Sequence, residues 1–147
     1  MVAASTEQKR CPTCKSDKSL TDFDKNRRQL NGVQTQCREC RKSSRGRDRR
    51  QVIAHYSNGT NNCECCGENR VEFLAIDHIK GGGSQHRRSI KTSIITWIIK
   101  RWKKEKNFPE GFRILCYNCN GALGYSGYCP HKTKNGNMNV LWFHLRC

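Results

Sequence analysis

Apolar residues are scarce in this sequence. They make up 35% of its 147 residues, and only 3 residues are proline. The longest apolar run, residues 94–99, is interrupted by Thr96 and falls far short of the ~20 residues that a membrane-spanning helix needs. The first ten residues contain no apolar stretch of the kind that forms a secretion signal. We therefore expect neither secretion nor membrane insertion, and we expect a source of stability other than a large core.

Acidic residues are also few. The chain has 12 Asp and Glu against 28 Lys and Arg, a net charge of +16 at pH 7. This excess favours a polyanionic partner such as a nucleic acid, because Lys and Arg neutralise phosphates. For residues 86–88, a solvated basic loop explains the run of basic residues as well as a phosphate contact does. The side chains that we expect to contact DNA are Arg45, Arg47, Arg49, Arg50, Arg87, Arg88, Lys100, Arg101, Lys103 and Lys104.

Cysteine, in contrast, is abundant. Of the 11 cysteines, eight form C-x2-C pairs, a spacing that is typical of zinc knuckles. Because no secretion signal is visible, reduced thiolates that hold Zn²⁺ in a cytosolic protein explain these pairs better than disulfides do. The pairs are Cys11/Cys14, Cys37/Cys40, Cys63/Cys66 and Cys116/Cys119.

The first two pairs predict one structural zinc site, with four unliganded thiols as the alternative. Four thiolates complete a tetrahedron and leave no open position for water. The segment between the pairs has few apolar side chains, so zinc would supply much of its stability. We assign this zinc-finger module to residues 1–45, with a disordered polar tail at 1–10. A basic linker helix, broken at Gly46, is expected at 46–57, before a turn-rich boundary.

The last two pairs predict a second structural zinc site, in a unit at residues 58–147. One metal would fix both ends of the long insertion between the pairs, whereas two separate half-sites are the alternative. Cys65 competes with Cys66 as a ligand, and we prefer Cys66 because it keeps the two-residue spacer. Spacing assigns no metal site to the remaining donors, namely Cys129 and His131, for which a structural role is expected, and Cys147, an expected free thiol.

Within this second unit the pattern predicts two strands with a helix between them. Residues 71–79 are rich in β-branched and aromatic residues and predict a strand that ends at a run of glycines. Residues 90–104 predict an amphipathic helix, with Trp97 and Trp102 in the core rather than stacked on bases. Residues 112–115 predict the second strand. The segment after the last pair predicts a helix only weakly, because it contains three glycines.

Three polar residues are candidates for catalysis. Asp77 and His78 end the first predicted strand, and Asn120 directly follows the last paired cysteine. Carboxylate and amide oxygens suit Mg²⁺ or a similar divalent ion, and a nearby imidazole can take a proton from water. Taken singly, each residue also has an ordinary explanation. Asp77 would cap a turn, His78 would be a surface residue and Asn120 would cap the next helix. A shared zinc at the paired cysteines would draw the three together.

The stretch LAIDHIKGGG…FRILCYNCN resembles the HNH endonuclease family, and in particular the zinc-bound HNH proteins of bacteriophages. The resemblance spans residues 11–131, although its specific motifs are short, and the first cysteine unit is similar to the zinc finger that often precedes such nucleases. It implies a small α+β protein with a ββα-metal, treble-clef-like nuclease domain. The chain departs from the family at Gly111, where many members have a central Asn that steadies the catalytic base.

By position, the resemblance implies that Asp77 and Asn120 hold a catalytic Mg²⁺ or Mn²⁺ ion. His78 would be the general base, and the last two cysteine pairs would hold a structural zinc. Cleavage would leave a 5′-phosphate and a 3′-hydroxyl.

The function that we predict is hydrolysis of DNA phosphodiester bonds. One metal and one base suit the cutting of one strand, so a double-strand break would need a homodimer or two nicks. Double-stranded or branched DNA, and possible phage proteins, are the expected partners, in the cytoplasm of a bacterial host. The alternatives are a non-catalytic zinc-finger DNA-binding protein, such as a phage regulator or packaging accessory, and an RNA-binding zinc protein. RNA ranks last because the aromatic residues do not cluster as a stacking platform.

Overall fold

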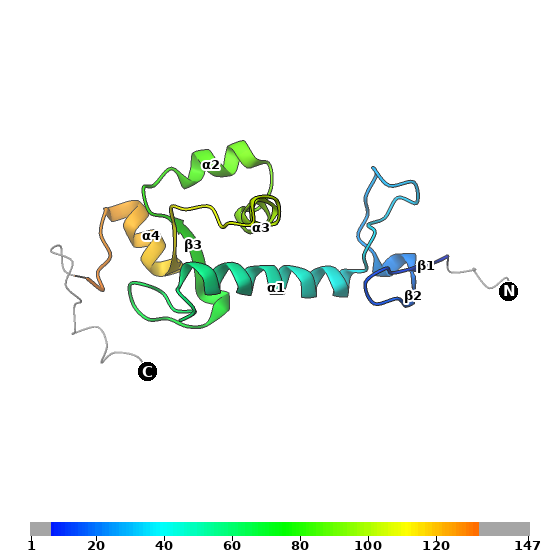
Figure 1. Ribbon diagram of the computed structural model, residues 1–147, viewed down its shortest axis with the longest axis horizontal. Coiled ribbons are helices and arrows are strands. Elements are labelled where there is room, and N and C mark those ends of the chain that lie inside the picture. The colour runs from blue at the N-terminus through cyan, green and yellow to red at the C-terminus, as the bar shows by residue number, and fades with distance from the viewer. Residues whose placement is uncertain (1–6, 133–147) are drawn as a thin grey trace. The chain divides into compact units, whose positions relative to one another are not determined.

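The computed structural model describes residues 7–132, and the chain divides into two compact units, Met1–Arg47 and Asp48–Cys147. The described residues form a small α+β protein with two two-stranded sheets and four α-helices (Figure 1). The expectations for residues 1–6 and for Cys147 lie outside this range. In the part of the chain that the structure describes, no helix is both long and apolar enough to cross a membrane.

The N-terminal unit opens with a short antiparallel ribbon. Strand β1 (Gln8–Arg10) pairs with strand β2 (Asp17–Ser19), and the 3-10 helix η1 (Leu20–Asp22) follows. The disorder expected at residues 8–10 is therefore wrong. Their side chains are polar and carry no strand signal, so only the pairing with β2 reveals the strand.

The core of this unit is very small. Its buried residues are Cys11, Phe23, Val33 and Cys37, and Phe23 is 2% exposed. Leu30, by contrast, is fully exposed. Half of the core therefore consists of cysteines, and Phe23 is its only large side chain.

Helix α1 (Arg38–Tyr56) begins inside the second cysteine pair and continues through Gly46. The predicted break at Gly46 is therefore wrong. A single helical glycine costs only ~1 kcal/mol relative to alanine, which a helix of this length absorbs. Val52 and Ile53 are the only buried residues of α1, so most of its surface is polar.

The C-terminal unit is built on a two-stranded hairpin. Strand β3 (Leu74–His78) pairs antiparallel with β4 (Phe112–Cys116), so Leu74 lies opposite Cys116 at one end and His78 opposite Phe112 at the other. Helix α4 (Tyr117–Ser126) follows β4 and contacts both strands. The hairpin therefore has a cysteine end and a histidine end.

The segment between the strands differs from the prediction. The first three residues of the predicted strand form the 3-10 helix η2 (Val71–Phe73). Helix α2 (Gly83–Ile90) replaces the expected basic loop, and helix α3 (Ile94–Glu105) starts later than predicted. The cause of the later start is Ser93, whose hydroxyl accepts the backbone N–H of Thr96 at 3.2 Å and caps the helix.

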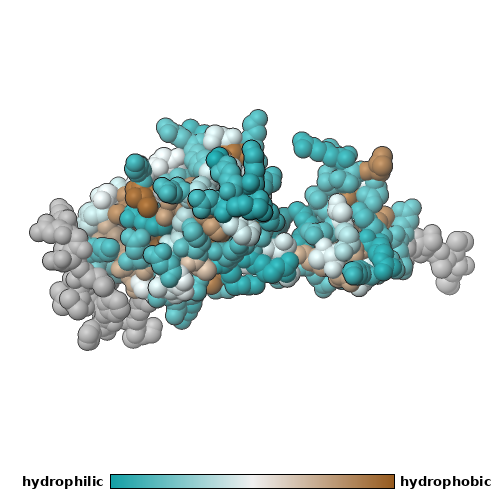
Figure 2. All heavy atoms as spheres, in the orientation of Figure 1, coloured by the Kyte–Doolittle hydropathy of each residue, from teal (hydrophilic) through white to brown (hydrophobic). Residues whose placement is uncertain are grey.

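Two apolar clusters stabilise the C-terminal unit. One contains Val52, Ile98, Ile99 and Phe112, and both Trp97 and Trp102 pack against it, which confirms their predicted place in the core. The second contains six cysteines among its ten buried residues. Hydrophilic residues cover most of the visible surface of each unit (Figure 2). The buried members of the second cluster are Ile53, Cys63, Cys65, Cys66, Leu74, Ile114, Leu115, Cys116, Cys119 and Cys129.

We expect Phe23→Ala to destabilise the N-terminal unit by about 3–5 kcal/mol, since truncation of a buried Phe leaves a cavity. Leu30→Ala is the matched control and should change stability by less than about 0.5 kcal/mol, because Leu30 is exposed. The measurement is hydrogen exchange of the Cys11 amide in the zinc-loaded protein. This amide donates to the Ser16 carbonyl at 2.9 Å. Equal exchange rates in the two variants would contradict this assignment of the core.

Candidate functional site

The four cysteines of the first two pairs lie together in the N-terminal unit. Their sulfur atoms all lie within 4.8 Å of one another. The first pair forms a tight turn in which the Lys15 N–H donates to the Cys11 carbonyl at 2.8 Å, with Lys15 in the left-handed region at φ 57°. The N–H groups of Cys37 and Cys14 lower the pKa of Cys11 to about 6, which favours the thiolate. This group can therefore hold a zinc ion.

The last two pairs also meet, and all four of these cysteines are buried within 4.8 Å of one another. A turn after Cys63 is closed by the N–H of Gly67, which donates to the Cys63 carbonyl at 2.9 Å. The second pair forms at the junction of β4 and α4, where the Cys116 sulfur accepts the Cys119 N–H at 3.4 Å. Cys66, the ligand preferred from the spacing, belongs to this group. The two pairs are thus brought together across the long insertion.

Sequence reasoning missed a third group of donors. Cys65, Cys119, Cys129 and His131 also lie within 4.8 Å of one another. The signal in the sequence was weak, because no two of these residues share the C-x2-C spacing. Their proximity depends on the turn after α4, which returns Cys129 and His131 to the cysteine cluster.

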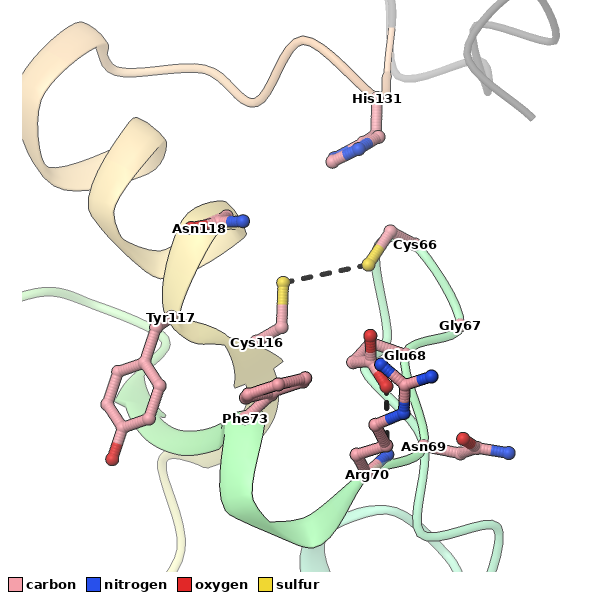
Figure 3. A pocket seen from close by; sticks show the side chains of 10 residues that line it. All are labelled: Cys66, Gly67, Glu68, Asn69, Arg70, Phe73, Cys116, Tyr117, Asn118 and His131. Carbon is pink, nitrogen blue, oxygen red and sulfur yellow. Dashed lines mark hydrogen bonds between the residues drawn. The ribbon is translucent and has the colours of Figure 1, made fainter. Parts of the chain in front are cut away.

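A hollow of about 750 Å³ lies beside these cysteines, and His78 is not among the residues that line it. In Figure 3 the sulfurs of Cys66 and Cys116 point toward one another, 3.6 Å apart, and the His131 ring points into the same hollow. Because sulfur ligands that complete a tetrahedron leave no position for substrate, we regard this hollow as the edge of a structural centre.

His78 belongs to a pair of imidazoles at the other end of the hairpin. Its Nε2 lies 2.8 Å from Nδ1 of His86 on α2, within hydrogen-bond distance. Phe112 packs edge-on against His78 at 4.8 Å between ring centres, and Trp97 packs against His86 at 4.5 Å. Partial burial lowers the pKa of His78, and the proximity of His86 lowers it further, which favours the uncharged imidazole.

Gly83 explains how α2 approaches His78 so closely. A Cβ at this position would lie 2.9 Å from the Nδ1 of His78, closer than non-bonded atoms approach one another. The glycine therefore keeps the space beside this ring nitrogen open. The predicted run of three glycines ends the strand, as expected, but its last member also starts the helix that carries His86.

Asp77 is bound to a neighbouring cation. Its Oδ2 accepts a hydrogen bond from Nε of Arg113, its partner across the hairpin, at 2.8 Å. Successive side chains of a strand point to opposite faces, so Asp77 and His78 face different surroundings. A carboxylate has a second oxygen, which this ion pair does not use. Asn120 lies in the first turn of α4, and among the described hydrogen bonds none joins it to Asp77 or His78.

The basic side chains expected to contact DNA have different surroundings. Arg49 donates to the backbone carbonyls of Val71 and Leu74, so it fixes η2 and the start of β3. Arg101 forms an ion pair with Glu105 at 2.8 Å. The remaining ones are exposed on helices, namely Arg45, Arg47, Arg50, Arg87, Arg88, Lys100, Lys103 and Lys104.

Neither a protein-family model, nor a curated protein, nor a solved structure matches this chain. The chemistry of the site must therefore be inferred from its own residues.

We expect Gly83→Ala to displace the His78 ring and to break its contact with His86, because the added methyl group occupies the space beside Nδ1. Gly124→Ala, a helical glycine whose added Cβ would meet no atom within 4 Å, is the matched control. NMR spectra of the imidazole nitrogens should show a shift for His78 and His86 in the first variant only. Unchanged imidazole signals in Gly83→Ala would refute the close packing.

Proposed function

We propose that this protein is a divalent-metal-dependent endonuclease that hydrolyses DNA phosphodiester bonds, with β3, β4 and α4 as an HNH-type ββα-metal unit. The observation that carries the proposal is the His78 imidazole at the end of β3, which contacts His86 through Nε2 and has a glycine, without a side chain, beside its Nδ1. An antiparallel hairpin followed directly by a helix, with a cysteine pair at the junction, supports the proposed architecture.

His78 is the proposed general base. If its Nε2–H donates to Nδ1 of His86, its own Nδ1 has a free lone pair and can accept a proton. The proposed nucleophile is a water that approaches this atom, which a side chain at position 83 would block. Proton transfer from that water to Nδ1 would generate the nucleophile that attacks phosphorus. His86 is then a positioning residue, which takes the role that a central Asn has in many HNH proteins.

The donor set of Asp77 and Asn120 fits a hard divalent ion, because both residues offer oxygen atoms. Mg²⁺ or Mn²⁺ held by these oxygens would polarise the scissile phosphate and stabilise the leaving oxygen. Arg113 fixes the Asp77 carboxylate through one oxygen and leaves the other for the ion. The cysteine groups, in contrast, have soft sulfur donors that suit zinc in a structural role.

The surroundings of the histidine pair favour a polyanionic substrate. Helices α2 and α3 contact each other and carry exposed basic residues beside the pair, including Arg87, Arg88 and Lys100. Phosphate contacts of this kind supply affinity without reading sequence. DNA, double-stranded or branched, is the proposed substrate, and we propose a phage origin on the resemblance alone.

The decisive experiment is a nicking assay with supercoiled plasmid and with branched DNA. Wild-type protein should cut at least one of them with Mg²⁺ or Mn²⁺ but not with EDTA. His78→Ala should lose about 100-fold or more in rate, because general bases contribute about 10²–10⁴. His55→Ala is the matched control and should keep its activity, because His55 is exposed and stacks on Phe108 instead.

Equal cutting by wild type and His78→Ala would contradict the role of His78. Binding without cleavage of either substrate would favour the alternative of a non-catalytic zinc-finger DNA-binding protein. Competition with RNA in the same binding assay tests the third possibility.

We expect Asp77→Asn to need a higher Mg²⁺ concentration for half-maximal cleavage, because an amide binds the ion more weakly than a carboxylate. Asp17→Asn is the matched control, since Asp17 also faces an arginine, Arg10, at 4.0 Å but lies in the N-terminal unit. Titration of the cleavage rate with Mg²⁺ measures both variants. Identical titration curves for wild type and Asp77→Asn would remove Asp77 from the metal site.

A further inference from the structure

Cys119 belongs to two groups of metal donors at once. It lies with Cys63, Cys66 and Cys116 in one group and with Cys65, Cys129 and His131 in the other. We propose that the C-terminal unit binds two zinc ions that share the Cys119 thiolate as a bridge. This second ion is independent of any activity on DNA.

The spacing of the donor atoms supports a metal in the second group. Nδ1 of His131 lies 3.3 Å from Sγ of Cys119 and also 3.3 Å from Sγ of Cys129. A tetrahedral zinc ion with Zn–S of ~2.3 Å and Zn–N of ~2.0 Å places a sulfur and a nitrogen ligand ~3.5 Å apart. The two observed sulfur–nitrogen distances are therefore close to the distance expected between two ligands of one zinc ion.

Hydrogen bonding explains this arrangement less well. A ring nitrogen carries either one proton or one lone pair, so Nδ1 of His131 forms one good hydrogen bond at a time. Here it lies at the same distance from two sulfurs. A metal ion at the centre of the group would satisfy these contacts together, because the four donor atoms lie within 4.8 Å of one another.

Burial supports the same conclusion. Cys65, Cys119 and Cys129 are at most 5% exposed, and none of them forms a disulfide. Buried thiols alone are common in protein cores. The further observation is that the half-buried imidazole of His131 lies within 4.8 Å of all three sulfurs. Thiolate and imidazole together are a typical donor set for zinc.

A shared thiolate resolves the competition between the two groups. With separate ligand sets, two ions would need eight donors, but the two groups hold seven. A thiolate sulfur has more than one lone pair and can bind two ions. The six thiolates and two Zn²⁺ ions then carry a net charge of −2, which the basic chain tolerates. The bridge also explains the position of the turn after α4, because the second ion ties Cys129 and His131 to Cys65.

The first test is the zinc content of the full-length protein, measured by elemental analysis and native mass spectrometry. We expect three zinc ions per chain, one in the N-terminal unit and two in the C-terminal unit. Cys129→Ser and His131→Ala should each retain two, whereas the matched control His55→Ala should retain three. Two ions in wild type, unchanged in Cys129→Ser, would overturn the proposal, as would a Cys65–Cys129 disulfide in the protein as purified.

The second test detects the bridge itself in wild-type protein, so it does not depend on a variant that folds. After replacement of zinc by ¹¹³Cd²⁺, two of the three cadmium NMR signals should show scalar coupling to each other through the Cys119 sulfur. Three signals without such coupling would mean separate ions and would overturn the shared ligand. DNA cleavage enters neither measurement, so failure of the proposed nuclease function would leave both results intact.

Discussion

Clusters of sulfur donors that could hold a metal ion are the feature on which the rest of this fold depends. A two-stranded hairpin is only marginally stable in water, and both sheets of the described chain have two strands. In the N-terminal unit the apolar core amounts to Phe23, Val33 and two cysteines. In the C-terminal unit, six of ten residues in one core cluster are cysteines. Thiols thus occupy the positions that apolar side chains fill in larger domains, and metal binding contributes to folding directly.

The cysteine cluster and the histidine pair lie at opposite ends of one hairpin. Cys116 lies opposite Leu74, whereas Phe112 lies opposite His78, four residues further along each strand. At ~3.3 Å per residue, the two ends are ~13 Å apart. The cysteine end consists mostly of buried thiols and borders the hollow at Cys66 and Cys116. The histidine end is partly exposed and is supported by α2 and α3 through His86 and Trp97.

Local features, and the convergence of the cysteine pairs that their spacing implies, could be predicted from the sequence, whereas other tertiary contacts could not. The four cysteine pairs and the two strands follow from spacing and from β-branched residues, which act over a few positions. Helix α2 was missed because three glycines and a basic run carry no apolar periodicity. The contact of His86 with His78 depends on that helix, and the Cys65 group depends on a turn that returns the chain to Cys119. Both arise from segments that fold against one another.

Ion pairs within the chain cannot neutralise its excess of positive charge. Twelve acidic residues can neutralise at most twelve of the 28 basic charges. Some arginines have structural roles. Arg49 donates hydrogen bonds to the carbonyls of Val71 and Leu74, and Arg113 donates one to the Asp77 carboxylate. Even after these assignments, most Lys and Arg side chains have no acidic partner to neutralise them. A surplus of this size is costly in a folded protein unless a polyanion offsets it, so the charge favours a nucleic acid independently of the histidine site.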